Sequence, residues 1–348
     1  MIILMPHLYM GGAEKQFRMF FLEQYERNKD AYIIALHSSP DEKTINFKNK
    51  YKSHVILHAL SKSGRWFFLC SYFAIFWDVL KLRWKRQDKI IIYETYWLPM
   101  LPILKMLGYR VIYSERNSGH HNSKISYELI RKCDAITTNS LMAQTILREA
   151  TSRNDVYVIN NGVEIPSQSY YKKYKKGEEL KILVPARITP EKNQCALVKA
   201  FAANKDINVF FAGNIIDQNY LEELQDLIKK SVNPQNFKIL GFVENMDQLY
   251  RETHLVVLPS LEEGTSNVIL ECFAKRIPII VSGIKQNLIM DRNKIFIFNA
   301  LEPDSLKRSV LSFRDMPPLE LDLELERSYN YVLNNYSVDL MVNSFNKL

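Results

Sequence analysis

The stretch Leu255–Ser282 constrains the fold more than any other part of this chain, because it indicates a strand, a loop and the start of a helix. Val256–Pro259 is a short apolar run that ends in proline, and the segment from Asn267 places its apolar residues on one helical face. Two carboxylates lie in it, Glu263 in the polar loop and Glu271 in the second turn of the helix. This pattern is typical of a parallel α/β unit with polar groups at a strand end.

The start of that helix predicts an anion site. Thr265 or Ser266 is placed to cap the helix, which leaves backbone N–H groups near Ser266, Asn267 and Val268 available to a phosphate. The two neighbouring glutamates can accept hydrogen bonds from hydroxyl groups. Together these groups suit a nucleotide sugar, although the same glutamates are also compatible with a solvated loop residue and a helix-surface residue.

Glu263, Gly264 and Glu271, with the strand before them, resemble the signature of the family-four retaining glycosyltransferases, which have the two-domain GT-B fold. The resemblance implies that Glu263 faces the hydroxyls of the donor sugar and that Glu271 binds the ribose of the nucleotide. It also implies donor contacts from Gly264, Thr265, Ser266 and Asn267 in the loop and the helix start.

A second motif lies at the start of the chain. The apolar run Met1–Met5 predicts a strand, and Gly11-Gly12-Ala13-Glu14 then leads into an amphipathic helix. The tetrad resembles the family's first loop, where Gly11 and Gly12 give the donor diphosphate close access to the backbone. The G-x-G-x-x-G pattern of dinucleotide enzymes is missing, which argues against a dehydrogenase. A tight turn that needs glycine only for its conformation remains the alternative.

A third motif follows the predicted strand Leu180–Val184. Arg187 and Lys192 resemble the family's diphosphate-binding loop, and two fixed cations can stabilise a leaving nucleoside diphosphate without a metal. The Asp-x-Asp motif of metal-dependent transferases does not occur in this sequence. We therefore expect Glu263, Arg187 and Lys192 to be the catalytic residues and no metal to be required, unless the cations belong to a solvated turn.

The acceptor side is less well defined. Lys89–Tyr93 and Arg110–Ser114 are predicted strands, and parallel sheets bind ligands at the carboxyl ends of their strands. Many family members carry a histidine after the second strand, whereas this chain has Glu115 and Arg116 there. We expect His7, Glu115 and Arg116 on the acceptor side, with Glu115 either a base or an ion-pair partner of Arg116.

The positive charge is concentrated in the first half of the chain. Residues 1–150 hold 22 basic and 13 acidic residues, against 24 and 25 in residues 151–348, within a formal net charge of +8. The aromatic run Trp66–Trp77 is followed by several basic residues, and as a helix it would extend about 18 Å, too short to span a ~30 Å hydrocarbon core. It suits either a contact with an anionic membrane surface or ordinary packing within an α/β domain.

Other classes of site find little support. The four cysteines are far apart, which argues against a zinc site or a disulfide framework and fits a cytoplasmic setting. No motif for nucleic-acid binding is present, so nucleic acid is not an expected partner. The first residues read as a strand and not as a signal peptide.

We therefore predict an α/β protein with two doubly wound Rossmann-like domains facing a cleft, the GT-B fold. Residues 1–163 form the acceptor domain, joined by a helix at about 335–348, and residues 164–334 bind the nucleotide sugar. The turn Asn160–Val163 and the lysine-rich linker Ile165–Gly177 mark the boundary.

The expected function is retaining transfer of a sugar from a nucleotide sugar, expected to be UDP-linked, to a lipid-linked or polysaccharide acceptor in bacterial surface-glycan assembly. The expected location is the cytoplasmic face of the inner membrane, peripherally bound to its anionic surface. The alternatives are a GT-B sugar-nucleotide epimerase and a noncatalytic scaffold in a membrane glycan assembly.

Overall fold

The structure is a computed structural model that describes residues 1–8, 12–27, 30–38, 42–58, 65–116, 123–263, 266–284, 287, 297–300 and 302–348. Within these ranges, the side chains of residues 13, 37, 38, 42, 43, 65–71 and 303 lie outside the description. The chain divides into two compact units. Unit 1 comprises Met1–Gly162 and Val338–Leu348, and unit 2 comprises Val163–Ser337.

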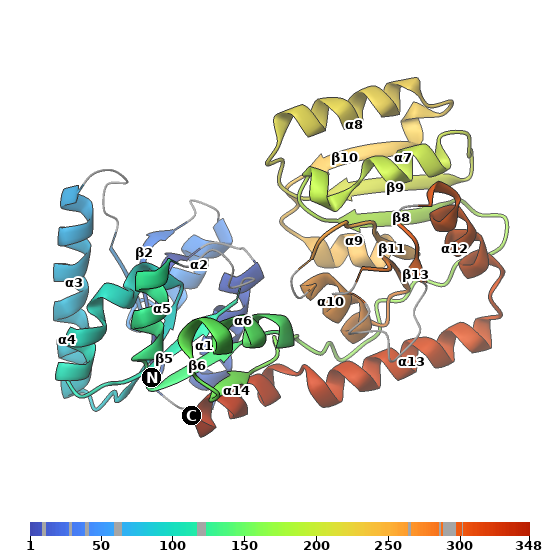
Figure 1. The fold of residues 1–348 in the computed structure, drawn as a ribbon. Coiled ribbons are helices and arrows are strands. Elements are labelled where there is room, and N and C mark those ends of the chain that lie inside the picture. The colour runs from blue at the N-terminus through green and yellow to red at the C-terminus, as the bar shows by residue number, and fades with distance from the viewer. Residues whose placement is uncertain are drawn as a thin grey trace. The chain divides into compact units, whose positions relative to one another are not determined.

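Unit 1 is built on a seven-stranded parallel sheet with the order β3-β2-β1-β4-β5-β6-β7 (Figure 1). The strands are β1 (Ile2–Leu8), β2 (Tyr32–Ser38), β3 (Val55–Leu57), β4 (Lys89–Tyr93), β5 (Arg110–Glu115), β6 (Ala135–Thr138) and β7 (Val156–Val158). From β1 the chain first extends the sheet to one side through β2 and β3, and then continues on the other side of β1 with β4. The neighbours β1 and β4 therefore form the point where the strand order reverses, which is where such sheets bind ligands.

Helices cover both faces of this sheet. They are α1 (Gly12–Glu26), α2 (Glu42–Lys50), α3 (Arg65–Trp84), α4 (Leu101–Met106), α5 (Lys124–Arg131), α6 (Leu141–Thr151) and α14 (Val338–Lys347). Successive residues of a strand point to opposite faces, so Ile2 and Leu4 pack with α3 to α6, whereas Ile3 and Met5 pack with α1, α2 and α14. A short 3-10 helix, η1 (Thr95–Met100), joins β4 to α4.

Unit 2 repeats the arrangement with a six-stranded parallel sheet in the order β10-β9-β8-β11-β12-β13. Its strands are β8 (Leu180–Pro185), β9 (Ile207–Ala212), β10 (Phe237–Gly241), β11 (Leu255–Leu258), β12 (Ile279–Ser282) and β13 (Ile297–Phe298). Here the order reverses between β8 and β11, which pair in parallel through Leu255 with Ile182 and Val256 with Leu183.

Two helical layers also enclose the sheet of unit 2 (Figure 1). The helices are α7 (Cys195–Phe201), α8 (Gln218–Lys230), α9 (Met246–Glu252), α10 (Asn267–Lys275), α12 (Pro303–Asp315) and α13 (Pro318–Asn335), with short 3-10 helices η2 (Pro190–Lys192) and η3 (Pro234–Asn236). Buried residues of α7, α8 and α12 pack on one face, and those of α9 and α10 on the other. The predicted fold class, α/β with two doubly wound parallel sheets, is confirmed.

The C-terminal helix α14 completes the core of unit 1. The ring of Phe345 packs edge-on against Phe20 of α1, with 5.2 Å between the centroids. A Cβ atom added to Gly162 would lie 3.0 Å from the Cα atom of Val338, so this close approach requires glycine. The helix predicted at about 335–348 is α14, which begins at Val338 because the backbone of Tyr336 leaves the helical region with φ −136°.

The aromatic segment predicted around residues 66–77 lies in α3, whose 20 residues run along the outside of unit 1 beside α4 (Figure 1). Ile75, Val79 and Leu82 are buried in the core of the unit, so one face of the helix packs on the sheet. The side chains of residues 65–71 are outside the described set. None of the helices in the described ranges combines the length and the apolar character that a bilayer crossing requires.

Candidate functional site

The candidate donor site lies in unit 2 at the carboxyl ends of β8 and β11, where the strand order reverses. Arg187 follows β8 by two residues, and Glu263 lies in the loop after β11. The two strands are hydrogen-bonded neighbours, so their following loops emerge side by side. The sheet topology thus brings together two motifs that are more than 70 residues apart in the sequence.

The loop after β8 is held against the end of β11 by local bonds. Asn193 adopts a left-handed conformation with φ 52°, which ends η2, and its side-chain amide donates to the carbonyl of Pro259 at 3.2 Å. The backbone N–H of Leu261 donates to the carbonyl of Glu191 at 2.8 Å. Asparagine tolerates the left-handed region better than most residues, which gives it this place in the loop. The two loops therefore form one connected structure.

Gly213, after β9, permits the backbone of the β8 loop to come close. A Cβ atom there would lie 2.1 Å from the carbonyl oxygen of Ala186 and 2.9 Å from the backbone nitrogen of Arg187. Any larger residue would displace the strand end that carries Arg187. The side-chain amide of Gln194 donates to the carbonyl of Arg187 at 2.7 Å and holds the same turn from the other side.

Lys192 and Glu263 form the central contact of the site. The ammonium nitrogen of Lys192 lies 2.9 Å from Oε1 of Glu263, and the two side chains are only 13% and 12% exposed. The hydroxyl of Ser260 donates to the same carboxylate oxygen at 2.6 Å. Both charged groups are thus positioned at the strand ends before any ligand arrives, which lowers the entropic cost of using them.

Arg187 differs from Lys192 in its exposure. Its side chain is 61% exposed, and Nη2 lies 3.8 Å from Oε1 of Glu191, too long for a strong hydrogen bond. A planar guanidinium in this position can bind a diphosphate through two parallel N–H groups. Together, Arg187 and Lys192 supply one exposed and one shielded cation.

Glu271 is positioned by α10 and by a tyrosine from the preceding helix. The buried hydroxyl of Tyr250 donates to Oε2 of Glu271 at 3.1 Å. Burial and the nearby Glu271 carboxylate raise the pKa of Tyr250 well above its ordinary value, so the tyrosine stays protonated and remains the donor. The carboxylate keeps acceptor capacity for the hydroxyls of a ligand.

The helix start behaves partly as expected. Ser266 is the N-cap residue of α10, with extended backbone angles, but its side chain makes no capping hydrogen bond to the first turn. Asn267 is the first residue of the helix. Gly264 and Thr265 lie outside the described residues, as does Gly11 in unit 1.

In unit 1 the acceptor-side candidates fall into different surroundings. His7 lies in β1 opposite His37 of β2, and Gly12 begins α1. Glu115 is the last residue of β5 and accepts a hydrogen bond from the hydroxyl of Tyr113 at 2.9 Å. These residues share the carboxyl end of the sheet.

Arg116 is a buried structural contact of unit 1, only 7% exposed. Its guanidinium donates to the carbonyl of Ile159 at 3.1 Å and to Oδ1 of Asn161 at 3.0 Å, and it lies over the ring of Phe345 at 5.3 Å. Burial lowers the pKa of Arg116 to about 10, so it remains charged at neutral pH. The sequence suggested Arg116 as an ion-pair partner of Glu115, whereas in the structure its guanidinium donates to Ser114, Ile159 and Asn161.

The structure adds residues that the motifs did not single out. Ser260 and Tyr250 hold the two glutamates of the donor site. Glu94, which the sequence places at the carboxyl end of the predicted strand Lys89–Tyr93, follows β4 with φ 67° and ψ 158°, a region that side chains rarely adopt. Burial raises the pKa of Glu94. Two of these residues have a sequence signal, because Glu94 and Ser260 closely follow the predicted strands that became β4 and β11. Tyr250 lies in α9 and has no such signal.

Comparison with protein families identifies the second unit. Residues 168–327 match the family model described as glycosyl transferases group 1. A search of curated protein sequences finds no match to the chain.

Solved structures share the whole fold at low sequence identity. The chain is similar to HepE from Anabaena in complex with UDP-glucose, with a TM-score of 0.79, 16% identity, and coverage of 99% of this chain and 98% of that one. A glycosyltransferase from Rickettsia africae gives a TM-score of 0.81 at 16% identity, covering 99% and 97%. The lipopolysaccharide outer core galactosyltransferase WaaB gives 0.68 at 15% identity, covering 99% and 98%. Residues 168–327, most of unit 2, thus match the group 1 glycosyl transferases, and the similarity of the whole chain to these structures confirms the two-domain GT-B fold that its motifs implied.

Proposed function

We propose that the protein is a retaining glycosyltransferase that moves a sugar from a UDP-linked donor to a lipid-linked or polysaccharide acceptor in bacterial surface-glycan assembly. The observation that carries the proposal is the Lys192–Glu263 contact of 2.9 Å at the point where the strand order of unit 2 reverses. It combines a cation for a phosphate with a carboxylate for sugar hydroxyls. The complexes of HepE with UDP and with UDP-glucose support the nucleotide sugar as the donor class.

The proposed reaction breaks the bond between the sugar and the diphosphate, and negative charge then develops on the leaving phosphate oxygen. Arg187 and Lys192 stabilise this charge, so that we propose no requirement for a metal ion. Because Lys192 is already held by Glu263 and shielded from water, its charge needs little rearrangement during the reaction.

Glu263 and Glu271 recognise the two polyol parts of the donor. In the proposed mode, Glu263 accepts hydrogen bonds from hydroxyls of the transferred sugar and Glu271 from the ribose. Tyr250 orients Glu271 through its hydroxyl. The departing phosphate takes the proton of the acceptor hydroxyl as the new bond forms on the same face, which retains the anomeric configuration and requires no strong base from the protein.

The proposed acceptor side is unit 1, where His7, Gly12 and Glu115 lie toward the carboxyl end of the sheet. We propose that the protein works at the cytoplasmic face of the inner membrane. The excess of basic residues in positions 1–150 and the exposed aromatic residues of α3 support an anionic membrane surface as a partner.

The proposal is tested by calorimetric titration with UDP and by following turnover of UDP-sugars with a bacterial lipid extract as acceptor. We expect UDP to bind wild type, and Lys192→Gln and Glu263→Gln to lose transfer. Lys229→Gln serves as the control, because Lys229 is an exposed lysine of α8 and its side chain is 74% exposed.

The outcomes separate the competing classes of protein. Conversion of a UDP-sugar without any acceptor would indicate an epimerase, and absence of UDP binding would indicate a scaffold. Either result contradicts the proposed transferase.

A further inference from the structure

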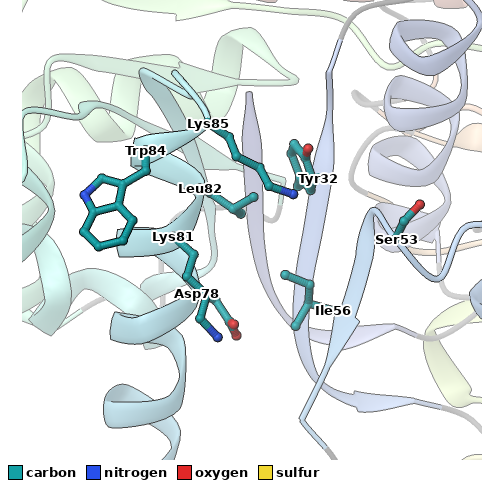
Figure 2. A pocket seen from close by; sticks show the side chains of 8 residues that line it. All are labelled: Tyr32, Ser53, Ile56, Asp78, Lys81, Leu82, Trp84 and Lys85. Carbon is teal, nitrogen blue, oxygen red and sulfur yellow. The ribbon is translucent and has the colours of Figure 1, made fainter.

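A groove lies along the inner side of α3 in unit 1, at the opposite end of the sheet from the acceptor-side candidates of this unit. Its volume is about 390 Å³, within the range of small-molecule sites. Figure 2 shows the side chains that line it, which come from the C-terminal half of α3 and the residue after it, from β2, and from β3 and the segment before it: Tyr32, Ser53, Ile56, Asp78, Lys81, Leu82, Trp84 and Lys85.

The groove opens near the amino ends of the strands. Tyr32 is the first residue of β2, Ser53 precedes β3, and Lys85 lies just before β4. Glu115 and the start of α1 lie at the other, carboxyl end of the same parallel sheet. Because ligands of parallel sheets bind at the carboxyl ends, this groove does not belong to the proposed transfer site.

The chemistry of the groove suits a phosphate attached to an organic group. Lys81 lies in the last turn of α3, and Lys85 directly follows the helix, where its backbone N–H donates to the carbonyl of Lys81 at 3.3 Å. Lys85 extends toward the ring of Tyr32, with its ammonium nitrogen 5.9 Å from the centroid (Figure 2). The side chains of Ile56 and Leu82 form an apolar part of the groove wall.

The acidic residue among the lining side chains is already engaged. Oδ2 of Asp78 lies 2.5 Å from Nε2 of His58, and the two side chains are 14% and 22% exposed. The lysines of the groove, in contrast, are exposed. An anion entering the groove therefore meets two lysine ammonium groups and a carboxylate that His58 holds.

The outer side of the same helix carries an aromatic stripe, which we define as Phe73, Trp77 and Trp84. Their exposed fractions are 66%, 47% and 80%, and their spacing of four and seven residues places them on one helical face. Trp84 belongs both to the stripe and to the rim of the groove, and its indole lies on the far side of α3 from Tyr32 in Figure 2. Exposed aromatic rings next to basic residues are typical of the boundary between lipid headgroups and acyl chains.

We propose that this surface binds an anionic phospholipid: the phosphate of its headgroup enters the groove between Lys81 and Lys85, while the aromatic stripe inserts at the headgroup boundary. The continuity of groove and stripe at Trp84 favours a lipid over a soluble phosphate compound, which would leave the stripe without a function. The inference rests on the proposed membrane-surface role and adds the class of lipid and the residues that select it.

The test is sedimentation of the full chain with vesicles of pure phosphatidylcholine or of phosphatidylcholine with 30% phosphatidylglycerol (about a third anionic, to give a strong surface potential). We expect binding to the anionic vesicles only. Lys81→Gln with Lys85→Gln should weaken it at least about tenfold, since each lysine near the surface contributes roughly 1 kcal/mol. The matched control is Lys124→Gln with Lys132→Gln, which removes the same charge from exposed positions of unit 1 and should weaken binding less than about threefold.

Two further arms separate the possible sources of phosphate. Replacing Phe73 and Trp77 by serine should reduce vesicle binding, and millimolar glycerol phosphate should not displace the wild type. If the Lys81 and Lys85 variant and the Lys124 and Lys132 variant lost vesicle binding equally, the effect would come from net charge alone. This result would contradict the proposal that the groove binds the phosphate. If glycerol phosphate displaced the wild type from vesicles and the serine variant bound them as well as wild type, the proposal that the groove binds a phospholipid would be wrong.

The proposal can also be separated from the donor chemistry. UDP binding by the Lys81 and Lys85 variant, measured by calorimetry, should equal that of wild type, because these residues belong to unit 1 and the donor residues to unit 2. Loss of vesicle binding with intact UDP binding supports the inference. If the wild-type chain bound vesicles but did not bind UDP, the proposed transferase function would be contradicted and the proposed lipid site would not.

Discussion

An arginine follows a strand near the reversal point of each sheet, and the two arginines have opposite environments. Arg187, after β8 of unit 2, is 61% exposed and has Glu191 at 3.8 Å as its ion-pair neighbour. Arg116, after β5 of unit 1, is 7% exposed and bonds to Ser114, Ile159 and Asn161. The guanidinium of Arg187 is therefore accessible to a ligand, whereas that of Arg116 bonds to other groups of unit 1.

The difference comes from what packs over each strand end. In unit 1 the chain end returns as α14 and places the ring of Phe345 5.3 Å from the guanidinium of Arg116. In unit 2 the neighbouring charges at the strand end are Lys192 and Glu263, which pair with each other and leave Arg187 at the surface. An arginine that follows a sheet strand is therefore exposed in unit 2 and buried by the protein's own contacts in unit 1.

The largest expected effect concerns the charged pair of unit 2. Lys192→Gln should lower the rate of sugar transfer by about 10²–10³-fold, because it removes a positioned cation from the leaving diphosphate. Turnover of the UDP-sugar measures it. The Lys229→Gln control should keep its rate, and an unchanged rate in Lys192→Gln would remove Lys192 from the proposed mechanism.

The next effect concerns stability and tests the structural role of Arg116. Arg116→Ala should lower the free energy of unfolding of unit 1 by about 2–4 kcal/mol, since it removes the side-chain donor of the buried carbonyl of Ile159 and the charged contact with Oδ1 of Asn161. Urea denaturation measures this loss. If the variant instead kept its stability and lost transfer, Arg116 would be the acceptor-side residue that the sequence suggested.

Acid should destabilise unit 2 through a buried histidine. The backbone N–H of Lys181 donates to Nδ1 of His254, whose side chain is 2% exposed, and burial lowers the pKa of His254 from 6.5 to about 4. The unfolded chain binds the proton more readily, so this contribution is complete above pH 6.5 and is lost as the pH falls toward 4, on the order of 3 kcal/mol.

Thermal unfolding between pH 7 and pH 4 measures the contribution. His254→Asn keeps an acceptor for Lys181 and should flatten the curve over this range. A wild-type curve as flat as that of the variant would show that burial does not lower the pKa of His254.

The smallest effect completes the comparison of the two arginines. Arg187→Gln should weaken UDP binding by about tenfold, the contribution of a charge-assisted contact with a phosphate, and should change the free energy of unfolding by less than about 0.5 kcal/mol. Calorimetry and urea denaturation of the same sample measure both. A large loss of stability in this variant would mean that the two arginines do not differ as their exposures indicate.

Much of the fold was predictable from local patterns. The strand Lys89–Tyr93 was predicted with the bounds of β4, and the helix from Asn267 begins where α10 begins, because short apolar runs and helical periodicity are local properties. The break between α13 and α14 was not predicted, since it depends on the backbone of the single residue Tyr336. Ser260 and Tyr250 were missed because no sequence pattern indicates which side chains will hold a glutamate.

The sequence by itself determined the alternation of strands and helices and the order of the three motifs. It also determined the spacing of Glu263 and Glu271, which lie within one loop and one helix, where covalent geometry limits the possible arrangements. Only the tertiary structure decided that Lys192 pairs with Glu263 and that Arg116 is buried against Asn161 and Phe345. The physical reason is that burial and pairing of a charge depend on residues brought close by the sheet order and by the returning helix, at sequence separations that no local pattern encodes.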